Sequence, residues 1–186
     1  MSTSSNGHYH HGDLRRALLD AALIILERDG EAGIQLRDLA RAVNVSPGAP
    51  YRHFDSRAAL LESLAVIGFQ RFIKKMEETA QINSPDIRVA MGRAYVQFAL
   101  ANPGLFRLMF SPEVRKDNRP GLRMAADQAF NTLRHVIGGT TGTNRVAALA
   151  AWARVHGLAV LLLDKQIALR VGDDVEQLID EVLSEF

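Results

Sequence analysis

The sequence predicts an all-α protein, and three observations lead to that prediction. Apolar residues recur three or four positions apart in most segments, which is the spacing of one face of an α-helix. No segment alternates apolar and polar residues over a useful length, and no hairpin turn is flanked by β-branched runs. Gly, Pro and Asn clusters separate the helical segments. The predicted architecture is an N-terminal three-helix domain followed by a larger helical domain.

The first predicted helix spans residues 13–29. An apolar stripe runs along it, formed by Leu14, Leu18, Ala21 and Ile25. Gly30 then ends the helix, because glycine is common just past a helix C-terminus. Residues 1–12 are rich in Ser, Gly and His, so we expect them to form a flexible tail.

A helix, a tight turn and a second short helix are predicted within residues 35–54. The first helix covers residues 36–43, and its apolar face consists of Leu36, Leu39, Ala40 and Val43. Asn44 tolerates the left-handed conformation that a turn after a helix needs. Ser46 can cap the next helix, with Pro47 at its first position. This is the helix-turn-helix plan, whose second helix enters the DNA major groove.

Pro50 interrupts the second helix, which is expected over residues 47–53. Its missing N–H removes one of the first helical hydrogen bonds, and its ring disfavours helical geometry at Ala49. We therefore favour an irregular first turn followed by a short regular helix. A second interpretation is that Pro50 fixes the angle at which Tyr51 and His53 meet the DNA backbone. The sequence leaves both open.

Further helical segments follow the helix-turn-helix. They are a helix over 56–80, a helix from after Pro85 to about Ala101, a short amphipathic segment over 105–110, and helices over 122–137, 146–163 and 174–186. Residues 111–120 contain charged residues and proline, so they are expected to form a charged loop.

The last two predicted helices indicate a subunit interface. The segment from Val146 to Leu163 is apolar almost all round, so it needs cover on several faces. The segment from Val175 to Phe186 has one apolar and one acidic face. Core packing alone could explain both helices, but helix-turn-helix proteins usually bind two half-sites as dimers. The residues predicted at a homodimer interface are Leu149, Ala153, Gly157, Val160, Val175, Leu178, Ile179 and Val182.

Net charge does not decide the function. The whole chain carries only +1, although residues 33–57 hold four Arg against two Asp, which gives 4 − 2 = +2. No apolar run approaches the about 18 residues of a membrane span. The N-terminus lacks the hydrophobic core of a signal peptide, so we expect a cytoplasmic protein.

Neither a metal nor another cofactor is predicted. The chain has no cysteine, which excludes disulfides and cysteine–zinc sites. His8, His10 and His11 lie in the tail without a Cys or carboxylate at ligand spacing, so they form a weak metal site at best. Contact of the tail with a DNA backbone is the favoured alternative.

Several short motifs resemble the DNA-binding domain of the TetR family of transcriptional regulators. They are Asp38-Leu39-Ala40, Val45-Ser46, Tyr51-Arg52-His53-Phe54 and Ser56-Arg57 with Leu60-Leu61. The resemblance extends from about Asp13 to Phe72. It departs from the family pattern at Gln35, where Thr is common, at Asn44, where Gly is usual, and at Arg57, where Lys is usual. Trp152-x-x-x-His156-Gly157 and residues 102–110 resemble one group of that family's C-terminal domains.

The resemblance implies both a domain organisation and a function. Residues 13–58 would form the DNA-binding domain, and residues 59–186 the regulatory and dimerisation domain. The protein would be a homodimeric repressor that binds a palindromic operator in double-stranded DNA. A small apolar effector would release it.

The resemblance also implies which residues contact DNA. They are Arg37, Ser46, Pro47, Gly48, Ala49, Tyr51, His53 and Arg57. Residues 47–49 would present the front of the recognition helix to base edges, whereas Tyr51, His53 and Arg57 would hold phosphates. Few of these side chains can make bidentate base contacts, so thymine methyl groups or DNA shape are expected to matter more.

Aromatic and Met residues gather in the second half of the chain and predict an effector pocket. Core packing is the simpler explanation for any one of them, but adaptable apolar walls suit ligand pockets. The predicted pocket residues are Met91, Tyr95, Phe98, Phe106, Met109, Phe110, Met124, Phe130, Trp152 and His156.

Two other functions remain open. One is an all-α enzyme with a hydrophobic pocket, although the chain has no nucleophile elbow, P-loop, H-E-x-x-H or dinucleotide fingerprint. An enzyme is therefore not predicted. The other is a DNA-binding protein without an effector, and the size of the second half disfavours it.

Overall fold

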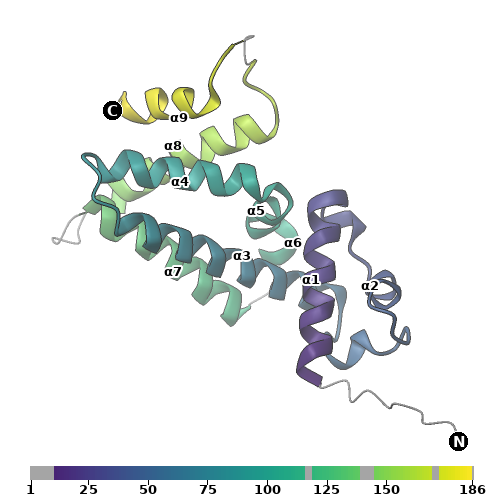
Figure 1. The fold of residues 1–186 in the computed structure, drawn as a ribbon. Coiled ribbons are helices and arrows are strands. Elements are labelled where there is room, and N and C mark those ends of the chain that lie inside the picture. The colour runs from purple at the N-terminus through teal and green to yellow at the C-terminus, as the bar shows by residue number, and fades with distance from the viewer. Residues whose placement is uncertain (1–10, 116–118, 139–144, 169–171, 186) are drawn as a thin grey trace, which may run out of the picture.

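The structure is a computed structural model that describes residues 11–115, 119–138, 145–168 and 172–185. Helices and turns make up this part of the chain, which contains no strand, so the predicted all-α fold is confirmed. Figure 1 shows α1 and α2 at one end of the molecule and the C-terminal helices stacked at the other. The predicted tail lies mostly outside the described residues, because residues 1–10 are among those left out.

The N-terminal end is built from short elements around a common core. They are α1 (His11–Asp29), the 3-10 turn η1 (Glu31–Gly33), α2 (Leu36–Ala42) and the 3-10 turn η2 (Pro50–Arg52). Leu18 and Leu26 of α1 are fully buried, as is Leu39 of α2. Asn44 has a φ of 55°, so the predicted left-handed turn after α2 is confirmed.

The long helix α3 (Arg57–Ala80) runs from the N-terminal end into the C-terminal bundle (Figure 1). Its buried face begins at Leu60 beside the core of the N-terminal end and continues to Met76. Ser56 caps it, because its Oγ accepts a hydrogen bond of 3.1 Å from Ala59 N. The domain boundary predicted at residues 58 and 59 falls within the first turn of α3.

Six helices form the rest of the described chain. They are α4 (Ile87–Ala101), α5 (Pro103–Phe110), α6 (Pro112–Arg115), α7 (Pro120–Gly138), α8 (Arg145–Leu163) and α9 (Val175–Ser184). The side chains of Asp86 and Asp174 cap α4 and α9, because they accept hydrogen bonds from backbone N–H groups in the first turns of these helices. Helix α4 packs between α3 and α8, and α9 covers its remaining side.

Two predictions of local structure are wrong. In the helix predicted over residues 47–53 the irregular first turn is present, but the regular helix expected after it is only the 3-10 turn η2, which begins at Pro50. Ser46 does not cap it, since Ala49 holds the cap position without a side-chain bond and is itself helical (φ −63°, ψ −40°). The charged loop predicted over residues 111–120 contains the one-turn helix α6. In both places proline begins a helical turn, where its missing N–H costs nothing.

Candidate DNA interface and effector pocket

The exposed residues of the helix-turn-helix form the candidate DNA surface. Arg37 is exposed at the start of α2, and Ser46, Pro47 and Gly48 are exposed in the turn before η2. Tyr51 of η2 is 48% exposed, which is high for an aromatic residue. A side chain at Gly48 would meet nothing within 4 Å, so the turn is open to a partner. These residues are therefore free to meet DNA.

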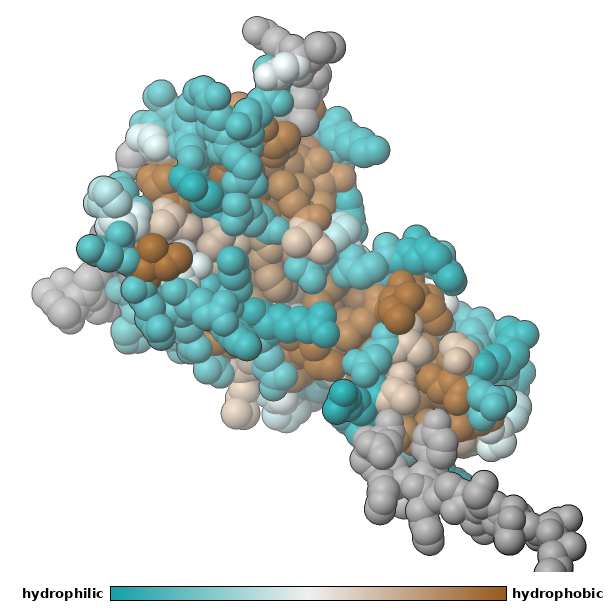
Figure 2. Space-filling view, viewed as in Figure 1, coloured by the Kyte–Doolittle hydropathy of each residue, from teal (hydrophilic) through white to brown (hydrophobic). Residues whose placement is uncertain are grey.

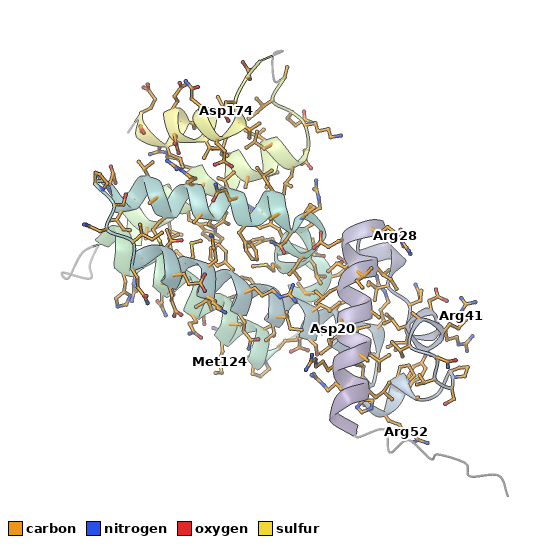
Figure 3. The ribbon with its side chains drawn as sticks, in the orientation of Figure 1. Asp20, Arg28, Arg41, Arg52, Met124 and Asp174 are labelled. Carbon is orange, nitrogen blue, oxygen red and sulfur yellow. The ribbon has the colours of Figure 1, made fainter. Side chains whose placement is uncertain are left out.

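Two arginines near this surface differ from what the sequence predicted about DNA contacts. Arg57 donates hydrogen bonds of 2.9 Å to the Ile34 carbonyl and 2.6 Å to the Glu31 carbonyl, which ties α3 to η1. A phosphate contact by Arg57 stays a prediction, but its guanidinium already has a structural role. Arg52 was not predicted as a contact, yet it is exposed and points away from the domain (Figure 3). Its position between Tyr51 and His53 is the signal that could have identified it.

A cavity of about 250 Å³ lies between α3, α4, α7 and α8, and we call it the aromatic cavity. Its lining residues are Phe69, Phe72, Tyr95, Phe110, Ala126, Asp127, Ala129, Phe130, Leu133, Arg145, Leu149 and Trp152. Four of these residues were predicted at a pocket, namely Tyr95, Phe110, Phe130 and Trp152. Phe69 and Phe72 were missed, although their spacing of three on the helix before the pocket could have placed them on one face.

The other predicted pocket residues lie elsewhere. Met91 lines a neighbouring cavity of about 450 Å³, and Phe106 and His156 line a third of about 440 Å³. Phe98 and Met109 are buried in the core. The prediction for Met124 is wrong, because this residue is 72% exposed on the outer side of α7 (Figure 3).

A chain of hydrogen bonds crosses the wall of the aromatic cavity. Trp152 Nε1 lies 3.1 Å from Tyr95 Oη, which lies 2.9 Å from His156 Nδ1. Tyr95 is 2% exposed, and this burial raises the pKa of its hydroxyl above the usual value. Burial also lowers the pKa of His156. Both groups are therefore neutral near pH 7.

Helix α5 connects the cavity with the N-terminal end. Its Phe110 lines the aromatic cavity, and its first turn is capped by a side chain of α1. Glu27 accepts hydrogen bonds from Gly104 N at 2.8 Å and from Leu105 N at 3.0 Å. At the other end of α5, Ser111 Oγ donates to the Glu31 carboxylate at 2.8 Å. Both ends of α5 are thus bound to the N-terminal end, at Glu27 of α1 and Glu31 of η1.

Helix α8 leaves an apolar face uncovered. Leu149 is 38% exposed and Leu161 is 46% exposed, while Ala153 is exposed and Gly157 and Val160 are half-buried between them. Figure 2 shows hydrophobic side chains on the surface beside the C-terminal end of α8. Among the described residues, α8 is also the one helix that is long and apolar enough to cross a membrane. Only 22% of its apolar stretch is buried within the chain. An apolar helix with this little cover is equally typical of a subunit interface.

Helix α9 contributes less to this face than predicted. The prediction for Ile179 is wrong, because it is fully buried within its own chain. Val175 and Leu178 are half-buried, and Val182 is 38% exposed. The apolar side of α9 packs on α4, and the ion pair of Arg93 with Asp180 joins the two helices.

Comparison with known proteins identifies the family. Residues 18–64 match the family described as "Bacterial regulatory proteins, tetR family", and residues 89–186, slightly more than half of the chain, match "Tetracyclin repressor-like, C-terminal domain". The HTH-type transcriptional regulator YobS of Bacillus subtilis is 30% identical over 96 residues. That alignment covers 51% of this chain and 50% of YobS, so the chain spans about half the length of this relative.

Solved structures share the fold over nearly the whole chain. A protein of unknown function from Rhodococcus sp. RHA1 is 32% identical, with a TM-score of 0.78 over 96% of this chain and 94% of that chain. The multidrug binding protein EbrR in complex with ethidium is 20% identical, with a TM-score of 0.68 over 94% and 98%. The resemblance predicted from sequence motifs is confirmed at both ends of the chain. The chain belongs to the tetR family of bacterial regulatory proteins, which are DNA-binding transcriptional regulators.

Proposed function

We propose that this protein is a cytoplasmic transcriptional repressor that binds a palindromic operator and is released by a small apolar or aromatic effector. One observation carries the proposal. Helix α3 joins the two functional parts, because Arg57 at its start is bound to η1 while Phe69 and Phe72 farther along line the aromatic cavity. A ligand that moves the wall of the cavity therefore acts directly on the helix that carries the DNA-binding end.

The second part of the proposal is a homodimer formed through α8. The uncovered face from Leu149 to Leu161 supports it, as does the exposed Val182 of α9. A two-fold dimer presents two helix-turn-helix units, so its operator should contain two half-sites about one helical turn or a small multiple apart. The proposed DNA contacts are those implied by the family, with the phosphate contact of Arg57 the least supported because of its structural role.

The third part is the mechanism of release. A ligand changes DNA affinity only if it binds two conformations of the protein with different affinities. We propose that these conformations differ in the separation of the two recognition elements, with α3 and α5 as the connections. EbrR, which has the same fold, was solved with ethidium, so this fold can hold an aromatic ligand. The family of the chain favours this regulator over the all-α enzyme.

An unbiased selection of bound DNA tests the proposal. The purified protein would be mixed with random double-stranded oligonucleotides, and the recovered sequences compared after several rounds. We expect enrichment of a palindrome or near-palindrome. Recovery of no preferred sequence would contradict sequence-specific binding, and a single half-site would contradict the dimer.

A further inference from the structure

The polarity of the hydrogen-bond chain at the aromatic cavity follows from its members. The Trp152 indole N–H can only donate, so Tyr95 Oη accepts that bond. The hydroxyl proton of Tyr95 then has His156 Nδ1 as its acceptor at 2.9 Å. This arrangement requires a neutral His156 with its proton on Nε2.

The opposite arrangement is less favourable. If His156 Nδ1 donated instead, Tyr95 Oη would accept two hydrogen bonds and its own proton would need another acceptor. No other hydrogen bond of Tyr95 is described, and the residue is 2% exposed. A buried donor without an acceptor costs more than an unused lone pair on an oxygen that already makes two bonds. Tyr95 Oη therefore keeps one free lone pair and no free proton.

The volume and lining of the aromatic cavity indicate the size and charge of the ligand that it can hold. An engineered cavity of about 150 Å³ binds benzene, so about 250 Å³ leaves room for one substituted ring or two fused rings. Six aromatic side chains line the space. The two charged lining residues, Asp127 and Arg145, have opposite signs, so the cavity favours no net charge.

We propose that the effector, whose existence rests on the proposed function, is an uncharged aromatic compound of one or two rings that carries a hydroxyl or amino group. Tyr95 Oη accepts the hydrogen of that group. Such a donor adds one hydrogen bond and breaks none. A ligand with only an acceptor has to turn the Tyr95 hydroxyl away from His156 and shift the histidine proton.

Three matched probes test the proposal by calorimetric titration of the full chain without DNA. 4-Ethylphenol offers a donor, 4-ethylanisole only an acceptor, and 4-ethyltoluene neither. One added hydrogen bond predicts that the phenol binds roughly 2- to 13-fold more tightly than the other two. Trp152 is the single tryptophan of the chain and lines the cavity, so quenching of its fluorescence shows that the probe binds there.

Two variants test whether the preference for the phenol depends on Tyr95 Oη. In Tyr95→Phe the preference for the phenol should fall below about twofold, because the accepting oxygen is removed. Thr79→Val is the matched control, because it removes a buried hydroxyl that lies outside the aromatic cavity, so the calorimetric preference should persist. Circular dichroism checks that both variants keep their helices.

The outcomes separate this inference from the proposed function. Equal or tighter binding of the anisole, a preference that survives in Tyr95→Phe, or no binding of any probe would each overturn the inference while leaving operator binding untouched. Preferred binding of the phenol without any change in DNA affinity would support the ligand class and contradict the effector-controlled repressor.

Discussion

The carboxylate of Glu27 in α1 caps the first turn of α5 at Gly104, with 2.8 Å between the carboxylate oxygen and Gly104 N. The two helices also touch at the backbone, because a Cβ on Gly104 would lie 2.3 Å from the Leu26 carbonyl oxygen. A negative charge at a helix N-terminus is favourable. One residue of the DNA-binding end therefore fixes the start of the helix whose other end lines the aromatic cavity.

Replacing Glu27 with alanine should weaken this connection. We expect a loss of about 0.5–2 kcal/mol in the free energy of unfolding, the range for a lost helix cap, together with a smaller effect of ligand on DNA affinity. Urea denaturation and DNA titrations with and without ligand measure the two effects. Glu77→Ala is the matched control, since Glu77 is exposed on α3 without a described partner. Equal results for both variants would exclude a role for the cap.

Substitutions at the DNA surface should separate phosphate contacts from base contacts. Tyr51→Phe should weaken binding to operator and unrelated DNA alike, because a phosphate contact carries no sequence information. Arg37→Ala should weaken binding and change the base preference. Fluorescence anisotropy at one fixed salt concentration checks both. A Tyr51→Phe protein with altered sequence preference and full affinity would refute these roles.

Protonation of His156 should destabilise the protein in acid. Burial lowers its pKa in the folded state below the unfolded value of 6.5, so the folded state binds the proton less well than the unfolded state. The stability from this residue is complete above the unfolded pKa and is lost as pH falls through the folded pKa. Urea denaturation between pH 8 and about pH 5 should show a steeper loss for the natural chain than for His156→Gln. Parallel curves would show that this histidine is not the group responsible.

The dimer interface can be tested with two matched surface substitutions. Leu161 is 46% exposed on α8, and Met124 is 72% exposed on α7. Leu161→Glu should place a charge in the interface and give a folded monomer of 20.5 kDa in sedimentation equilibrium. Met124→Glu should remain a dimer. If both variants sediment like the natural chain, α8 is not the interface.

The sequence predicted the features that depend on local spacing. Helical periodicity predicted most of the helices, and Asn44 predicted the turn of the helix-turn-helix. The recognition element differed because two local preferences compete at Pro50. The ring disfavours a helical Ala49, yet Ala49 is helical, and the buried Pro50 serves as the first residue of a 3-10 turn.

Features that depend on which surfaces meet could not be predicted in the same way. The apolar side of α9 is amphipathic by sequence, but nothing local shows that α4 of the same chain covers Ile179. Phe69 and Phe72 join the cavity wall because α3 packs on α4 and α7. Met124 is exposed on α7 whereas Phe130 of the same helix lines the cavity, so a similar residue type did not imply a similar position.

The most direct test of the account is the affinity of the protein for its selected operator with and without a ligand that quenches Trp152. Fluorescence anisotropy should show a loss of roughly 5- to 150-fold when the aromatic cavity is occupied, the usual range of allosteric coupling. Phe130→Trp, which fills part of the cavity, should keep the operator affinity and lose the response. A ligand that saturates the cavity and leaves operator affinity unchanged would contradict the central claim.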